Sequence, residues 1–242
     1  MNGFWAVCKR ELKGYFITPL AYVFLVIFLF FAAYLTFKDR FFEARQADMQ
    51  IFFRWLPRLF VFLVPATAMR LWAEERKSGS IELLLTLPIT IWQAVLGKFV
   101  AAWLFLGLAL VLTFPLAITV AYLGDPDGGV IFTGYIASIL LAGAYLAIGS
   151  FFSAVNKNQV IAFVLSVVAC AVLVAAGLPT TLDFFSFMGA GFVRFLEQIS
   201  FEVHFEAMQR GVIQFKDVSY FLLLIAGWIA ACGILLQERK AA

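Results

Sequence analysis

The chain has 242 residues, of which 64% are hydrophobic and only 14% charged. Soluble globular domains are about half apolar and about a quarter charged, so this composition excludes a soluble protein and indicates a polytopic membrane protein. The formal net charge of +3 comes from scattered residues and gives no support for nucleic acid binding. The three cysteines, Cys8, Cys170 and Cys232, are odd in number and two of them lie in apolar runs, which argues against a disulfide or a metal site.

The first 17 residues have the pattern of an amphipathic helix. Phe4, Cys8 and Leu12 share one helical face, with the basic residues largely elsewhere, so residues 1–17 are predicted to form an elbow helix at the cytoplasmic surface. Pro19 then stands at the first position of the next helix. The apolar run that follows is too long for a cleaved signal peptide and lacks an Ala-x-Ala exit, so we expect the first span there.

Six apolar runs predict an all-α protein with six transmembrane helices. These helices are expected to form one transmembrane domain that covers residues 1–242. The expected spans are about 19–37, 51–72, 91–123, 131–155, 160–178 and 218–236. Pro65 is expected to kink the second span and Pro115 to bend the third. The third span is longer than a bilayer needs, so its first turns, including Lys98, are expected to project into the cytoplasm.

Small residues and loop charges add two expectations. In the fourth span, Gly149 and Ser153 are four residues apart, a spacing that allows helices to approach closely. The N-terminal segment and the hairpin at Lys157 carry basic residues, whereas the turn at 124–129 carries none. This bias predicts that both termini are cytoplasmic.

Residues 180–216 interleave aromatic and charged side chains without a clean helical or strand period. They are expected to form short amphipathic or partly re-entrant helices at the outer surface. Gly211 is expected to end one of them, and Asp217 to cap the last span. His204, the sole histidine, has only two glutamates close to it in sequence, so a packing role is favoured over metal binding or pH sensing.

The most informative segment is the polar stretch AEERKSGSIELLLTLPITIWQ between the second and third spans. Ser80 is well placed to cap a short helix that has Glu82 in its first turn, and Pro88 ends that helix after about two turns. The helix is therefore predicted at about 80–87. Thr90 has capping-box spacing to the glutamine that follows it, which starts the third span at Ile91.

The leucine-rich body of this short helix has two possible roles. It could lie on the lipid as an interfacial helix, or it could dock a soluble partner. The stretch MRLWAEERKSGSIELLLTLPIT resembles the segment of ABC-2 type transporter permeases that forms the coupling helix, which favours docking. The resemblance implies an ABC-2, type V exporter-like fold. It also implies that ATPase coupling involves Arg70, Glu74, Glu75, Arg76, Gly79, Ser80, Glu82, Leu83, Leu84 and Pro88.

Two further phrases extend the resemblance over essentially the whole chain. IGSFFSAVNKNQVIAF resembles the hairpin between spans four and five of that family. ISFEVHFEAMQRGVIQFKDVSYF resembles the approach to the last span in the gliding-motility and nitrous-oxide-reductase-maturation branch. In the gliding-motility branch the partner is often a second permease with a large domain outside the membrane.

The resemblance implies a half-transporter of the bacterial cytoplasmic (inner) membrane. Two such subunits, identical or related, would pair and sit on two ATP-binding cassette subunits, with membrane lipid around them and an extracytoplasmic accessory protein as a further partner. ATP and Mg²⁺ would bind the cassettes, so we expect no cofactor and no enzymatic activity in this chain. Lys98 follows a glycine, but Trp92 stands where a phosphate-binding loop needs its first glycine.

Two mechanisms remain open for such a subunit. It could export solute or extrude lipid, or it could act as a mechanotransmitter on an outside partner without moving a solute. The scarcity of polar residues in the spans favours transmission slightly, and the lack of acidic residues and histidine at mid-depth in five of them argues against ion coupling. An intramembrane enzyme is disfavoured, because the sequence offers no paired acids, metal ligands or serine–histidine arrangement.

Overall fold

A computed structural model describes residues 3–38, 48–79, 89–124 and 126–241, and every regular element in these ranges is helical. Its helices are α1 (Gly3–Ile17), α2 (Pro19–Lys38), α3 (Gln50–Ala68), α4 (Arg70–Ser78), α6 (Ile91–Val111), α7 (Phe114–Leu123), α8 (Gly128–Val155), α9 (Gln159–Ala175), α10 (Pro179–Phe184), η1 (Ser186–Met188), α11 (Ala190–Ile199), α12 (Phe201–Gln209) and α13 (Phe215–Ala241).

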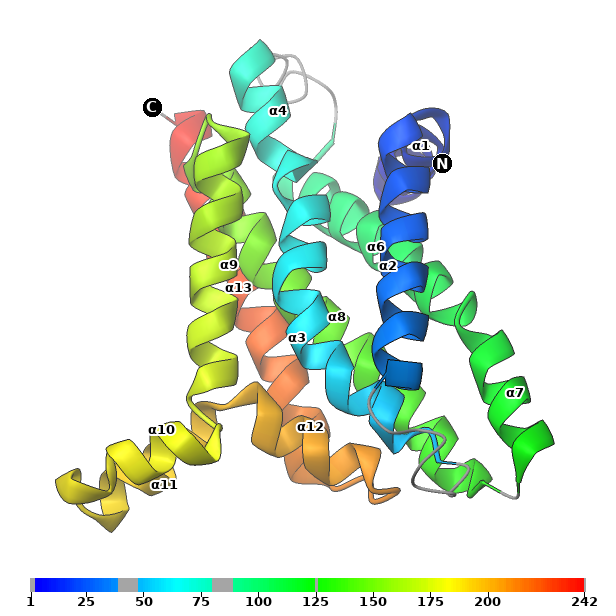
Figure 1. Cartoon of the computed structure of the whole chain (residues 1–242). Helices are drawn as coiled ribbons and strands as arrows, with labels where there is room; N and C mark the ends of the chain where they lie inside the picture. Colours follow the sequence, from blue (N-terminus) through cyan, green and yellow to red (C-terminus); the bar gives the residue numbers. More distant parts are fainter. Residues whose placement is uncertain (1–2, 39–47, 80–88, 125, 242) are drawn as a thin grey trace.

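The long helices run side by side and define two ends (Figure 1). Helices α1 and α4 lie at one end together with both chain termini, and we call this the Lys98 end. Helices α10, α11 and α12 lie at the opposite end, which we call the His204 end. Because the termini share one end, the expectation that both face the same side of a membrane fits this arrangement.

Helix α8 is the central element of the bundle. It packs against α3, α4, α6, α9, α12 and α13, and residues 141–150 are all buried. The small residues of this stretch explain how so many neighbours fit, because they let helix backbones approach closely. A Cβ atom added at Gly149 would lie 2.4 Å from the Cβ of Ala68 on α3.

Five helical stretches are long and apolar enough to cross a membrane, namely Pro19–Lys38, Gln50–Ser78, Ile91–Leu123, Gly128–Val155 and Phe215–Glu238. The remaining expected span, 160–178, corresponds to α9, which has 17 residues and a length of about 26 Å at about 1.5 Å per residue. That length is at the lower limit for a span. The all-helical membrane fold is confirmed, whereas the number of six spans stays a prediction.

The expected third span is divided into α6 and α7. The capping box at Thr90 is present, and α6 begins at Ile91 as expected. The helix then breaks at residues 112–113, just before Pro115 in the first turn of α7. Proline has no N–H to donate to the preceding turn, and the Thr113 hydroxyl donates to the Leu110 carbonyl, 2.6 Å away, at the break.

The His204 end is built around α12, whose Phe201 and Phe205 are buried. The His204 ring is also buried; its Nδ1 lies 2.6 Å from Asp217 Oδ1, and its Nε2 lies 3.1 Å from the Gln198 carbonyl oxygen. The expectation for Asp217 as a helix cap needs correction, because it is the third residue of α13 and its carboxylate contacts His204 instead. The sequence analysis considered only the glutamates close to His204 and did not pair it with Asp217, which is 13 residues away.

We expect substitution of Gly149 by alanine to destabilise the bundle, because the added methyl group collides with Ala68 on a packed helix rather than with a flexible chain end. The expected loss is about 1–3 kcal/mol, the usual cost of overpacking. Thermal unfolding in detergent measures it. Gly107→Ala is the matched control, since in the described part of the chain no neighbouring group lies within 4 Å of its added Cβ. Equal melting temperatures for the two variants would refute the close contact.

Candidate functional site

A buried lysine at the Lys98 end joins three helices that are distant in sequence. The Lys98 ammonium, on α6, lies 2.9 Å from Glu75 Oε1 on α4 and 3.1 Å from Glu11 Oε1 on α1. Its side chain is 3% exposed, and its ammonium also lies 5.3 Å from the centre of the Trp72 ring. A charge this deeply buried needs paired charges around it, and the two carboxylates supply them.

The first turns of α6, which the sequence analysis expected to project into the cytoplasm, are covered by other helices around Lys98. Helix α1 packs along α6, with Val7 against Gly97, where an added Cβ would meet the valine side chain at 3.0 Å. This cover by α1 removes Lys98 from water. Arg10 completes the cluster, since its guanidinium lies 2.8 Å from Glu11 Oε1 and 3.7 Å from Glu75 Oε1.

The cationic neighbours change the acidity of Glu11. Burial alone raises the pKa of this carboxyl group, but the attraction of Lys98, together with hydrogen bonds from Arg10 and Lys98, outweighs burial and holds the pKa below its ordinary value of 4.5. The ionised form is therefore favoured in the folded protein. The cluster contributes stability at neutral pH that is lost as the pH falls through the lowered pKa.

A serine on α8 connects the central helix to the junction of α3 and α4. The Ser153 hydroxyl donates to the Met69 carbonyl, 2.8 Å away, and accepts the backbone N–H groups of Trp72 and Ala73, each at 3.0 Å. A side chain inserted among the backbone groups of a helix interrupts its regular hydrogen bonds, which accounts for the break at Met69. The Trp72 indole N–H adds a 3.3 Å bond to the Ser150 hydroxyl.

Arg76 provides a second connection between α4 and α8. Its guanidinium donates to the carbonyl oxygens of Ala154, at 2.6 Å, and Val155, in the last turn of α8. The final carbonyls of a helix have no partner within the helix and carry partial negative charge, so a cation is favourable there. Together with the Ser153 contacts, this attaches α4 to the last turns of α8 at two places, Trp72–Ala73 and Arg76.

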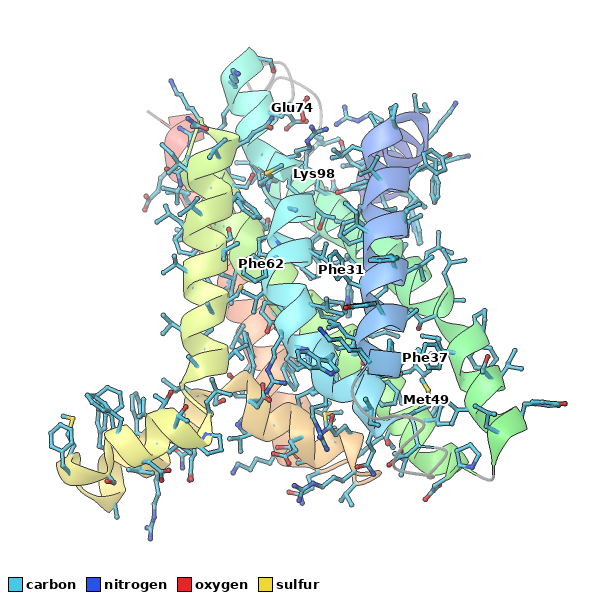
Figure 2. The ribbon with its side chains drawn as sticks, in the orientation of Figure 1. Phe31, Phe37, Met49, Phe62, Glu74 and Lys98 are labelled. Carbon is cyan, nitrogen blue, oxygen red and sulfur yellow. The ribbon has the colours of Figure 1, made fainter. Side chains whose placement is uncertain are left out.

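The other predicted coupling residues fall into two groups. Arg70 lines a hollow next to α1, Glu74 is exposed at the same end (Figure 2), and Gly79 ends α4 with a φ of +74° in the left-handed region. The predicted coupling helix, 80–87, lies outside the described residues together with Ser80, Glu82, Leu83, Leu84 and Pro88, so its docking role stays a prediction.

Sequence reasoning named Glu75 and Arg76 but did not find the contacts of three further residues at this end. Ser153 was noted only as a small residue, Lys98 was expected to project into the cytoplasm with the first turns of its span, and Glu11 was not singled out. One signal was available for Glu11: it is an acidic residue in a strongly basic amphipathic segment, where it lies between Arg10 and Lys13. The arrangement as a whole attaches α4 to α1, α6 and α8. No group of three or more His, Cys, Asp and Glu side chains among the described residues could hold a metal ion.

These features define a class: an all-helical, multi-pass membrane protein with a short charged helix fixed at one end of its bundle. The model of the ABC-2 family transporter protein matches residues 5–236, nearly the whole chain, and the protein belongs to that family. It is therefore the membrane permease component of an ABC transporter. Comparison with individually curated proteins gives no match.

Replacement of Lys98 by methionine should destabilise the fold by about 2 kcal/mol, because Glu11 and Glu75 would be left close together without their shared cation. The value is below the roughly 3–5 kcal/mol of a fully buried pair, since both carboxylates are about one fifth exposed. Thermal unfolding provides the measurement. Lys157→Met removes an exposed lysine from the hairpin and serves as the control; equal stability of the two variants would contradict the assigned burial.

The lowered pKa of Glu11 predicts a pH-dependent effect. Glu11→Gln should be less stable than the unchanged protein at pH 7, where the carboxylate is ionised and paired. The difference should begin to shrink below the ordinary pKa of 4.5, where the carboxyl group of the unfolded chain takes up a proton, and should be lost as the pH falls through the lowered pKa of the folded protein, where Glu11 loses the attraction of Lys98. Melting temperatures measured from pH 7 down to below this lowered pKa test this, and a difference that is constant with pH would rule it out.

Proposed function

We propose that this permease couples ATP hydrolysis by a partner ATP-binding cassette subunit to work across the membrane, through α4 and the segment that follows it. Family membership supports the presence of a cassette partner, since ABC-2 permeases generally work with such subunits. In the proposal, the cassette contacts residues 80–88 at the Lys98 end, and ATP binding displaces that segment together with α4.

The observation that carries the proposal is the attachment of α4 to two other helices, α6 and α8. Glu75 connects it to α6 through Lys98, Arg76 connects it to the end of α8, and Ser153 of α8 binds its first turn. A force applied after Gly79 would therefore act on the centre of the bundle rather than bend a loose loop. Helix α8 in turn contacts α12 and α13, which reach the His204 end.

The proposed assembly has two permease subunits, identical or related, and two cassettes that bind ATP and Mg²⁺. The Lys98 end faces the cytoplasm of a bacterial cell, with the protein in the cytoplasmic membrane. The basic residues Lys9, Lys13 and Lys77 at this end support that orientation. Affiliation with the gliding-motility and nitrous-oxide-reductase-maturation branch rests on the sequence phrase at 199–221 and is part of the proposal.

A second candidate function is ATP-driven mechanotransmission to an extracytoplasmic partner without solute transport. One observation favours it: several buried hydroxyls in the spans donate to carbonyls of their own helices, namely Thr36 to Ala32, Ser138 to Gly134 and Ser166 to Ala162. Hydroxyl groups that already donate within their own helix provide few hydrogen bonds to a hydrophilic solute. Proteins that co-purify with the intact complex discriminate the two, because transmission requires a bound extracytoplasmic protein.

We expect Leu84→Pro to release the cassette, because proline breaks the predicted short helix on which docking depends. The measurement is recovery of the ATPase subunit with the tagged permease from the same membranes, with Leu84→Ala as the control for loss of the leucine side chain alone. Membrane insertion and melting temperature should stay unchanged. Normal recovery of the cassette and normal ATPase stimulation in the proline variant would refute docking through this segment.

A further inference from the structure

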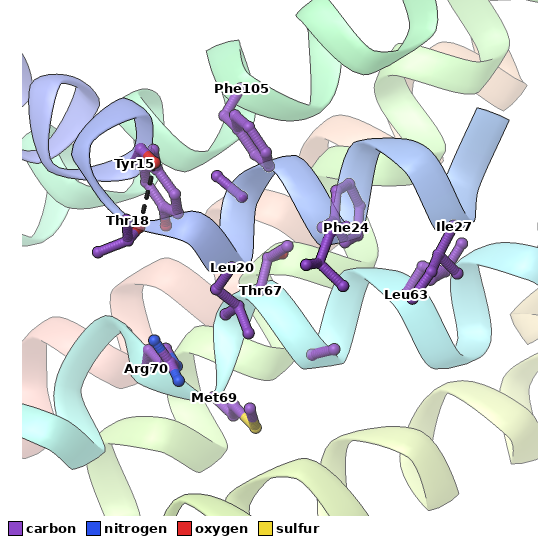
Figure 3. Close-up of a pocket in the computed structure, with 13 residues that line it drawn as sticks. Tyr15, Thr18, Leu20, Phe24, Ile27, Leu63, Thr67, Met69, Arg70 and Phe105 are labelled. Carbon is purple, nitrogen blue, oxygen red and sulfur yellow. Dashed lines mark hydrogen bonds between the residues drawn. The ribbon is translucent and has the colours of Figure 1, made fainter.

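An apolar cavity lies between α2 and α3 where they meet α1 and α6 (Figure 3). Its volume is about 180 Å³, and its walls include Leu20, Phe24, Ile27, Leu63 and Phe105. An apolar cavity of about 150 Å³ is large enough to bind benzene, so this one has room for part of a hydrocarbon chain. We call it the Arg70 cavity, because Arg70 is the charged residue among those that line it.

Two of the three hydroxyl groups in the cavity wall, those of the two threonines, already donate hydrogen bonds to backbone carbonyls. Thr67 donates to the Val64 carbonyl at 2.7 Å, and Thr18 donates to the Gly14 and Tyr15 carbonyls at 3.2 and 3.1 Å. Neither hydroxyl needs a polar ligand or water in the cavity. The interior of the cavity therefore favours an apolar occupant, and Arg70 supplies a charge at one end of it.

A polar hollow adjoins the Arg70 cavity and shares Tyr15, Thr18 and Arg70 with it. Its lining also contains Glu11 and Glu74. The Nε atom of Arg70 is buried and has no hydrogen-bond partner in the described part of the chain. A buried donor without a partner is unfavourable, so an acceptor supplied by a ligand would stabilise this arrangement.

The apolar surface continues beyond the Arg70 cavity along the same two helices. A further cavity of about 470 Å³ shares Ile27 and Leu63 with it and extends to Phe62 and Arg58. Arg58 and Arg70 are 12 residues apart on α3 and α4, a rise of about 18 Å at about 1.5 Å per residue. One leaflet contributes about 15 Å of hydrocarbon, so this groove matches the depth of an acyl chain.

We propose that the groove between α2 and α3 binds one phosphatidylethanolamine molecule. An acyl chain occupies the Arg70 cavity, the phosphate accepts hydrogen bonds from Arg70, and the ammonium group pairs with Glu74. Glu11 is already occupied by Lys98 and Arg10, whereas Glu74 is exposed and takes part in none of the ion pairs among the described residues. The cation and the carboxylate in one hollow match a zwitterionic headgroup better than an anionic one.

A lipid is the occupant that the surroundings favour. The rim of the groove on α2 carries Leu20, Val23 and Ile27, whose side chains are between 39% and 51% exposed. Exposed apolar side chains of a span contact lipid tails, so a tail can enter the groove from the bilayer without crossing a polar barrier. The proposal does not depend on cassette docking, because it concerns only the permease and the bilayer.

Native mass spectrometry of the delipidated, purified permease tests the proposal after addition of phosphatidylethanolamine and phosphatidylglycerol in equal amounts. The unchanged protein should retain one phosphatidylethanolamine. Arg70→Gln removes the phosphate ligand and Ala66→Phe fills the cavity, so each should reduce retention about tenfold or more, which corresponds to about 1.4 kcal/mol. Glu74→Gln should retain both lipids equally, since the ammonium loses its partner.

Two variants control for general effects of charge and bulk. Lys157→Gln removes an exposed charge from the hairpin, and Val168→Phe adds bulk to an exposed position on α9; both should retain lipid normally. Melting temperatures show whether each variant is folded. The proposal is overturned by equal retention in Arg70→Gln, Ala66→Phe and the controls, or by a lipid-free dimer in which cross-links at Val23 show that a second copy covers the groove.

Discussion

The ammonium group of Lys98 is the interaction on which the arrangement of the Lys98 end depends. A buried charge is costly unless its partners stay close, so α1 and α4 cannot leave α6 without exposing an unpaired charge to an apolar environment. Three segments that are far apart in sequence are therefore held as one unit. The Trp72 ring contributes to the same site through its contact with the ammonium group.

Helix α8 extends this unit through the bundle. Its Ser153 binds the start of α4, and about two turns earlier the Tyr145 hydroxyl donates to the Pro57 carbonyl of α3 at 2.9 Å. The Tyr145 ring also packs against Phe201 of α12, with ring centres 4.9 Å apart. A continuous set of packed groups therefore joins the two ends. Under the proposed coupling, this path would carry displacement of α4 towards the His204 end.

Hydropathy and capping patterns predicted most of the helices, because those patterns depend on residues that are close in sequence. The start of α6 at Ile91 and the end of α12 before Gly211 follow from such local chemistry. The ion pairs of Lys98 and the contact between His204 and Asp217 could not be predicted in this way. They depend on how α1 lies on α6 and how α12 lies on α13, and no local pattern encodes that packing. For the same reason, the burial of Lys98 could not be predicted.

Gly79 has a consequence that differs in kind from these contacts. Among the described residues no atom lies within 4 Å of where its side chain would be, yet its φ of +74° is strained for any residue that carries a side chain. The direction in which the chain leaves α4 is therefore set by one backbone torsion angle and not by contacts with neighbouring groups. A ranking of positions by steric crowding would judge Gly79 freely replaceable, whereas almost any substitution there would change the direction in which the chain leaves α4.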